Sequence, residues 1–173
     1  MEEKQLEYLG TFGVGSKLGG KLVISDPTYK LGTWCNVIVP VKGGEWKAYA
    51  ERKDCGEWGN RVASLVAVHS DYEIGKLKEE YFEPVANVGI DSGTMSIVDI
   101  EEWKNSISMS EVMWEKINGA NGASIVPPYG VTCASGYGDG VYMVEGAGEF
   151  NDRMLQNQFH ALRIIFIEDE EEE

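Results

Sequence analysis

Four aspartates carry chemistry that a binding site or an active site would need, namely Asp26, Asp91, Asp99 and Asp139. Each stands beside glycine or at the expected end of a strand, where a carboxylate can face a ligand. Carboxylates that lie together bind a hard divalent cation through oxygen, or act as acid and base. The competing interpretation is structural, because an Asp at a turn also accepts hydrogen bonds from nearby backbone N–H groups. For each Asp taken singly, the sequence favours the structural interpretation.

Asp139 is the acidic residue that we expect to contact a ligand. It lies in Gly138-Asp139-Gly140, where the flanking glycines leave its carboxylate unshielded and allow close approach to the backbone. Tyr129, Tyr137 and Trp34 flank loops and could line a pocket, although large aromatic residues of a small β-domain more often belong to its core. The residues predicted to contact a ligand or partner are Asp139, Tyr137, Asp91 and Tyr129. If the protein is instead a hydrolase assisted by a divalent cation, that cation is held by Asp26, Asp91, Asp99 and Asp139.

Other catalytic patterns are missing from the sequence. The two histidines, His69 and His160, have no neighbouring Ser or Cys in a nucleophile setting, and no G-x-S-x-G elbow occurs. Residues 136–140 have neither the ligand spacing and terminal Glu of an EF-hand nor the Gly-Lys-Ser/Thr of a P-loop. These absences argue against a Ser-His-Asp or Cys-His active site.

Charge and cysteine content restrict the partners and the compartment. The chain has 29 acidic and 15 basic residues and a net charge of −14, which argues against a nucleic-acid partner. It permits a basic protein partner, cation binding or simply high solubility. Three cysteines without a Cys-x-x-Cys pair favour reduced thiols, and neither a signal peptide nor an apolar run of ~18 residues is present. We therefore expect a cytoplasmic protein that neither binds nor crosses a membrane.

The elements that must position the aspartates come in two similar runs. Residues 14–26, VGSKLGGKLVISD, resemble residues 88–99, VGIDSGTMSIVD. Residues 61–70 match residues 160–169 at every position in being polar or apolar. We predict one domain, 1–173, built from two degenerate repeat halves, 8–71 and 85–169. If these halves pack about a pseudo-twofold axis, Asp26 and Asp99 take equivalent positions.

The predicted fold is all-β, a barrel or a sandwich. Glycine, at 21 of 173 residues, separates short β-branched and aromatic runs, which is typical of strands joined by tight turns. Residues 71–84 are expected to be a linker with a helical turn at 76–81, and residues 119–129 a loop. One helix, residues 110–118, is inserted in the second half, and residues 169–173 form an acidic, disordered tail. Strands are expected at 8–14, 21–25, 33–41, 45–51, 62–68, 85–90, 94–100, 131–134, 142–145 and 161–168.

Three motifs, taken in order, resemble a known family. They are Ile24-Ser25-Asp26-Pro27-x-Tyr29, then residues 88–93 (VGIDSG), then Gly138-Asp139-Gly140-Val141-Tyr142. This combination resembles the bacterial and phage domain-of-unknown-function 4241 family. Asp99 is followed by Ile100 where a second Asp-Pro would be expected. The resemblance implies a β-rich fold and a bacterial or phage source, and no activity that can be transferred.

Two functions follow from these observations. The first is a non-enzymatic acidic binding protein of a phage or bacterial mobile element, which engages a protein partner or a small ligand through glycine-rich loops and needs no cofactor. The alternative is a hydrolase assisted by a divalent cation at the clustered aspartates.

Overall fold

The computed structural model describes residues 6–15, 20–105, 122–126, 128, 130–149 and 158–169. These residues form eleven strands, one short α-helix and three 3₁₀ turns, which confirms the all-β prediction. The first half contributes β1 (Leu6–Val14), β2 (Gly20–Ser25), β3 (Asn36–Val41), β4 (Gly44–Asp54) and β5 (Asn60–His69). The second half contributes β6 (Glu83–Ile90), β7 (Thr94–Asp99), β8 (Ala123–Val126), β9 (Gly130–Ala134), β10 (Gly140–Glu149) and β11 (Gln158–Ile165).

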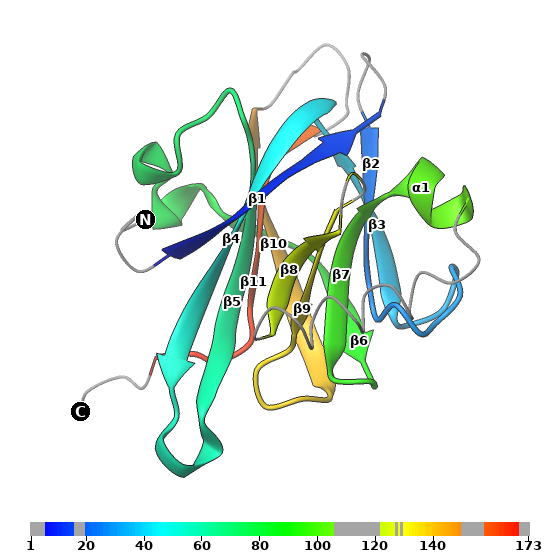
Figure 1. Ribbon diagram of the computed structural model, residues 1–173. Helices are drawn as coiled ribbons and strands as arrows, with labels where there is room; N and C mark the ends of the chain where they lie inside the picture. Colours follow the sequence, from blue (N-terminus) through cyan, green and yellow to red (C-terminus); the bar gives the residue numbers. More distant parts are fainter. Residues whose placement is uncertain are drawn as a thin grey trace.

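The strands form two antiparallel runs that are joined into one sheet, nearly closed as a barrel (Figure 1). One run has the order β1-β4-β5-β11-β10-β6, and the other has the order β3-β2-β7-β9-β8. β11 and β3 connect them through a parallel pairing of Phe159 with Val41. Where β1 faces the other run, the Gly13 N–H donates to the Pro128 carbonyl at 3.1 Å. Both runs therefore enclose a single interior.

The core follows the period-2 alternation of the strands. On β4, Trp46, Ala48 and Ala50 are fully buried, as the alternation of residues 45–51 predicts. Trp46 also donates its indole N–H to the Lys42 carbonyl at 2.8 Å, which satisfies the one polar atom of this ring. The main core draws on β-strands of both halves, including Leu22 and Leu162.

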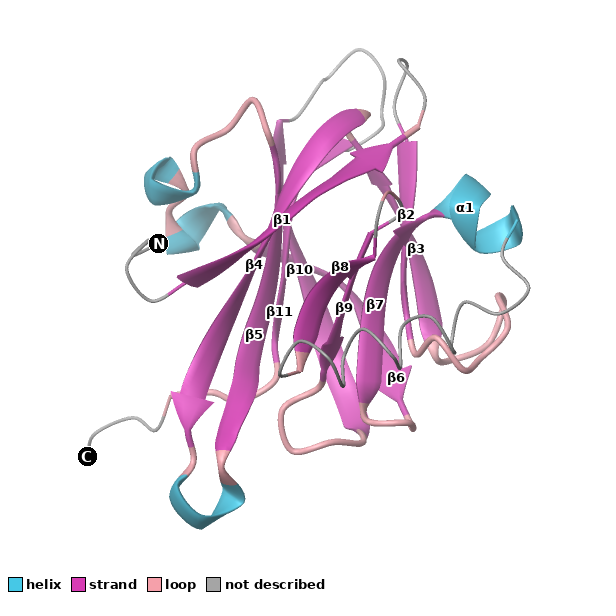
Figure 2. Ribbon diagram, viewed as in Figure 1, coloured by secondary structure: helices cyan, strands magenta, loops and turns pink. Residues whose placement is uncertain are grey.

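The structure corrects three expectations about elements. Residues 119–129 contain a strand, β8, because Ala123 and Val126 have partners in β9 and are buried. β3 begins at Asn36 and not at Thr33. Thr33 lies in a turn, where its carbonyl accepts a hydrogen bond from the Asn36 N–H. Residues 71–84 carry two 3₁₀ turns, η3 (Ile74–Lys76) and η4 (Glu79–Tyr81), where one helical turn was expected (Figure 2).

The second half contains a helix, as predicted, but the described helix is α1 (Ile100–Asn105), which follows β7 directly. The predicted helix at 110–118 lies outside the described residues, as does the acidic tail after Asp169. A further 3₁₀ turn, η2 (Gly56–Trp58), closes the β4–β5 hairpin. In the described part of the chain, no helix has the length and apolarity that crossing a membrane requires.

Two strand pairs join the predicted repeat halves. β2 runs antiparallel to β7 with Ile24 opposite Ile97, and β5 runs antiparallel to β11 with Leu65 opposite Ile164. In the alignment of the halves these are matched positions, and a twofold axis between two antiparallel strands places the matched residues at the axis opposite each other. Among the described residues of the first half, β8 and α1 have no counterpart. The repeat itself stays a prediction.

Candidate functional site

Asp26 is a structural residue whose carboxylate is fully occupied. It is completely buried, and it accepts hydrogen bonds from the backbone N–H groups of Thr28, Asp91 and Ser92 at 2.7–3.0 Å. The hydroxyls of Thr28 and Ser92 donate to it at 2.7 and 2.8 Å. Burial raises the pKa of Asp26, but these hydrogen bonds together lower that pKa by more, so its net shift is downward. Asp26 thus fastens the β6–β7 turn to the end of β2.

Asp99 has the same kind of role at the other end of the β2–β7 pair. One carboxylate oxygen accepts from the Gly15 N–H at 2.8 Å, and the other accepts from the Glu101 N–H at 2.9 Å. The second bond caps the start of α1. Asp99 lies opposite Leu22, four residues before Asp26, and at ~3.3 Å per residue the two aspartates are ~13 Å apart. They cannot share one cation.

Asp91 and Asp139 lie at the same end of the sheet as Asp26. The Tyr29 hydroxyl donates to Asp91 at 2.5 Å, and this bond, followed by desolvation, raises the pKa of Tyr29 to about 12. A Cβ atom at Gly93 would lie 4.0 Å from a carboxylate oxygen of Asp139, so Asp139 is close to the β6–β7 turn. Among the described residues, no three His, Cys, Asp or Glu side chains are grouped so that they could hold a metal ion.

The aromatic residues of the predicted site are largely open to solvent. Trp34 is 61% exposed and lies against the backbone of Gly89, and Tyr137 is 59% exposed and faces the Arg61 guanidinium at 5.7 Å. The turn that carries Tyr137 bonds to itself, because Ser135 and Tyr142 both donate to the Gly138 carbonyl. Tyr129 lies outside the described residues. The structure brings Asp91 and Asp139 to one end of the sheet, but the cavity described below does not include them.

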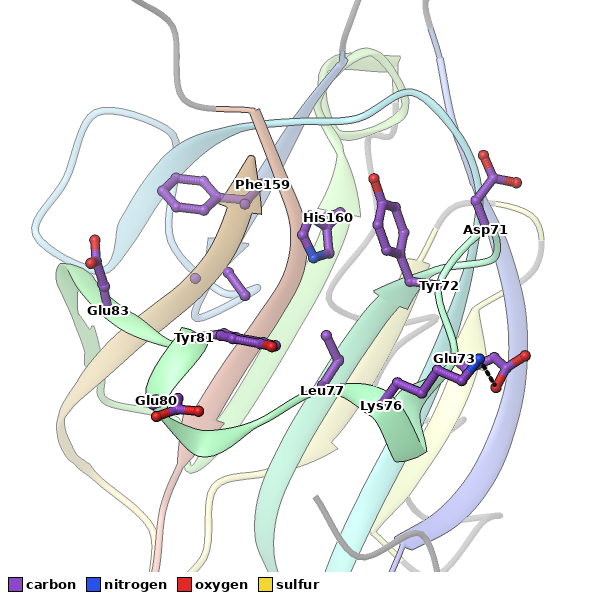
Figure 3. Close-up of a pocket in the computed structure, with 13 residues that line it drawn as sticks. Asp71, Tyr72, Glu73, Lys76, Leu77, Glu80, Tyr81, Glu83, Phe159 and His160 are labelled. Atoms are coloured by element: carbon purple, nitrogen blue, oxygen red, sulfur yellow. Dashed lines mark ion pairs between the residues drawn. The ribbon is translucent and has the colours of Figure 1, made fainter. Parts of the chain in front are cut away.

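A cavity of about 600 Å³ opens elsewhere, between the 71–84 segment and the β10–β11 hairpin (Figure 3). The residues of β10 that line this cavity are the small Gly146, Ala147 and Gly148, near the end of the strand. Ala147 pairs with Ala161 on β11, and both are buried on the face that the 71–84 segment covers. Short side chains in this position leave open the space that larger ones would fill.

Four of the residues that line the cavity carry aromatic rings. Tyr72, Tyr81, Phe159 and His160 line it, and Figure 3 shows them around one open space. The Tyr72 and His160 rings are stacked, with 3.9 Å between centroids and 10° between planes. The Phe159 ring covers Gly146, where a Cβ atom would come within 2.6 Å of it. The glycine at 146 is therefore required for the observed position of this wall.

The 71–84 segment is not the free linker that the sequence predicts. Ile74, Leu77 and Phe82 are buried in a second apolar cluster on the outer face of β5, β10 and β11. At its start, the Asp71 N–H donates to Nδ1 of His69 at 3.1 Å, and Nε2 of His69 lies 2.9 Å from the Gly43 carbonyl. These partners assign the neutral tautomer with the proton on Nε2, which donates to Gly43.

Arg163 holds the other end of the segment against the sheet. Its side chain is 7% exposed, its guanidinium donates to Glu79 and, at 3.3 Å, to Glu145, and it lies 4.3 Å from the Phe82 ring centroid. Burial lowers the pKa of Arg163, but the two carboxylates raise it by more, so the arginine remains charged. Its Nε has no hydrogen-bond partner among the described residues. The roof of the cavity is thus fixed to β11 by charge and by ring contact.

The sequence contains a signal for this cavity that the prediction did not use. In residues 71–84 the apolar side chains Ile74, Leu77 and Phe82 recur among charged ones, which indicates a segment with one buried side. The Gly146-Ala147-Gly148 run likewise marks a strand face without large side chains. What could not be read from the sequence is that these two stretches, about seventy residues apart, face each other.

Comparisons of this chain with protein-family models, with curated proteins and with solved structures find no match. The resemblance to the 4241 family stays a prediction.

Proposed function

We propose that this chain is a non-enzymatic binding protein, and that its ligand occupies the cavity between the 71–84 segment and the β10–β11 hairpin. The ligand is a small molecule or a flexible part of a protein partner. One observation carries the proposal: an aromatic-walled space of about 600 Å³, within the range of roughly 300–1,000 Å³ that is typical of ligand sites. The cytoplasmic setting and the bacterial or phage source expected from the sequence belong to the same proposal.

The arrangement of the walls supports binding because both sides of the cavity are anchored. Its floor is β-sheet, and its roof is fastened by Arg163 and by the buried Leu77. A ligand that enters a preformed site does not have to order the protein, so less of its interaction energy is lost. Tyr72, Tyr81 and Phe159 offer large contact areas at low conformational cost.

The turn that carries Asp139 is the competing position for a ligand. Tyr137 and Asp139 are exposed there, but the carbonyl groups of the turn are already bonded within it. A turn whose carbonyl groups are bonded within it offers fewer free polar groups to a small ligand. We therefore assign the ligand to the cavity and use this turn as the control.

The test is a fragment screen followed by nuclear magnetic resonance on wild-type protein, Ala147→Leu and Tyr81→Ala. Ala147→Leu fills the floor, and Tyr81→Ala removes a wall residue that is 48% exposed and not needed for the core. We expect fragments that bind wild type to bind both variants at least about fivefold more weakly, equivalent to ~1 kcal/mol.

Tyr137→Ala is the matched control, since it truncates another exposed tyrosine, 59% against 48% for Tyr81, away from the cavity. It should leave fragment affinity unchanged. The proposal would be wrong if the affinities respond to Tyr137→Ala and not to the cavity variants, or if no fragment shifts the resonances of cavity residues.

A further inference from the structure

We infer that the group bound in the cavity is an organic cation, an ammonium or a guanidinium; this inference rests on the proposed function. Four carboxylates line the cavity, against one lysine, Lys76. The carboxylates are those of Asp71, Glu73, Glu80 and Glu83. The whole chain carries a net charge of −14, so long-range electrostatics also favours a cation over an anion.

Among the described residues, Glu83 is the one carboxylate of the cavity without a cationic partner. The other three form ion pairs at the surface: Asp71 with Lys42 at 3.2 Å, Glu73 with Lys76 at 3.4 Å, and Glu80 with Lys78 at 3.9 Å. No hydrogen bond or ion pair to the Glu83 side chain occurs within the described part of the chain. Exposed ion pairs of this kind are weak, so a bound cation can also share or replace a lysine.

The aromatic walls already hold cations of the protein itself. The Lys42 ammonium lies 5.1 Å from the Tyr72 ring centroid, and the Lys78 ammonium lies 5.8 Å from the Tyr81 centroid. Both distances are within the range in which a ring face attracts a cation. An exogenous cation beside these rings would gain the same attraction and would be better desolvated inside the cavity.

The unpaired carboxylate lies at one end of the cavity, and Tyr72 lies at the other. In Figure 3, Glu83 and Phe159 are at the left of the view, Glu80 and Tyr81 lie between them and the open space, and Tyr72 lies across that space. A cation placed there would have a carboxylate as counter-ion and aromatic faces as walls. The apolar stem of such a ligand would extend over Ala147 and toward Leu77.

Calorimetric titration with a matched set of probes tests this inference on the full chain. Butylguanidinium and butyltrimethylammonium represent free cations, pentanol is a neutral probe, and valerate is an anion. The capped peptide acetyl-Gly-Arg-Gly-amide represents a basic side chain of a protein, and the same peptide with citrulline in place of Arg is its neutral isostere. We expect the cations to bind and valerate not to bind. If the Arg peptide binds more tightly than butylguanidinium, the source of the cation is a protein segment. If butylguanidinium binds more tightly, the source is a free small molecule.

Variants connect the binding to the named residues. Glu83→Gln keeps the size of the side chain and should weaken cation binding about tenfold, as expected for the loss of a charged hydrogen-bond partner. It should leave the binding of neutral probes unchanged. Glu57→Gln, on the remote η2 turn, makes the same chemical change and should have no effect. Raising the salt concentration should weaken wild-type cation binding, because exposed charges are screened.

The outcomes separate this inference from the proposed function. Pentanol or the citrulline peptide could bind as tightly as the cations, with an affinity that depends on Ala147 and Tyr81. That result would overturn the cation assignment and leave the binding site intact. Cation binding that Glu83→Gln does not weaken would overturn it as well. If neither these probes nor any fragment depends on Ala147 or Tyr81, both the inference and the proposed function fail.

Discussion

The number of hydrogen-bond donors around Asp26, Asp99 and Asp139 decides what each carboxylate can do. Asp26 accepts five hydrogen bonds, three from backbone N–H groups and two from hydroxyls. Asp99 accepts from backbone N–H groups on two different elements. A carboxylate with its lone pairs occupied stabilises the fold and is a poor ligand for a cation. Asp139, in contrast, is exposed at the tip of its turn.

Asp26→Asn should destabilise the protein by ~1–3 kcal/mol, because an amide nitrogen would face N–H donors in a buried site. The pH dependence has a defined sign. Since folding lowers the pKa of Asp26, its contribution to stability is complete above the ordinary value of 3.8 and is lost as the pH falls below that value. Urea unfolding between pH 7 and pH 3 measures both effects.

Asp139→Asn is the matched control for this measurement. The exposed turn should change stability by no more than about 0.5 kcal/mol. Suppose that Asp26→Asn is as stable as wild type at pH 7 and that its stability falls equally steeply as the pH is lowered. Asp26 would then contribute little to stability.

At the level of elements, the 71–84 segment depends on one buried arginine. Arg163 contacts Glu79, Glu145 and Phe82 at once, and it connects this segment to β11 and β10. An edge-to-face contact of Tyr72 with His69, a stack of Tyr72 on His160, and an apolar cluster hold the rest of the segment. The cavity therefore persists only while this anchoring persists.

Replacing Arg163 with Met should loosen the 71–84 segment selectively. The variant keeps apolar contact with Phe82 but leaves Glu145, which is 20% exposed, without its partner. Amide hydrogen exchange should accelerate at residues 74–83 at least about fivefold more than in β4 or β5, as expected when local opening becomes easier by ~1 kcal/mol. Glu145→Gln should have a larger effect than Glu79→Gln, because the Glu79 side chain is 70% exposed. Uniform acceleration over the whole chain would contradict this account.

At the scale of the whole molecule, the two predicted halves share one core. Strands of both halves line it, and the β2–β7 and β5–β11 pairs cross from one half to the other. Neither half could bury its apolar side chains without the other. The predicted repeat halves would therefore be related by internal symmetry, and we do not expect them to fold as separate units.

We expect cooperative, two-state unfolding as a consequence. Urea titration followed by tryptophan fluorescence and by far-ultraviolet circular dichroism should give coincident transitions. Trp46 reports on the core, whereas Trp34 and Trp58 are exposed and contribute little change. Two separated transitions would indicate that the halves fold independently, and the single-domain prediction would then be wrong.

Short-range patterns in the chain are enough to predict the local features of this protein. Alternation of apolar residues, as in Trp46-x-Ala48-x-Ala50, indicates a strand because side chains of a strand point alternately to its two faces. Glycine residues and the Asp-Pro step likewise predict turns, because turn preference depends on the residues at the turn itself. β8 was missed because four residues carry too little pattern to reveal a strand, and pairing with β9 is what stabilises it.

Only the tertiary structure decided what the chemically suggestive residues do. Three of the five hydrogen bonds to Asp26 come from donors 65 and 66 residues away, and Asp99 accepts one from Gly15, 84 residues away. The cavity likewise requires residues 71–84 and Gly146-Ala147-Gly148 to meet across β11. Such contacts depend on how strands pair at long range, which residue type and spacing do not specify. For that reason the sequence suggested a site at the aspartates, whereas the folded chain has its cavity beneath a segment that the sequence presents as a linker.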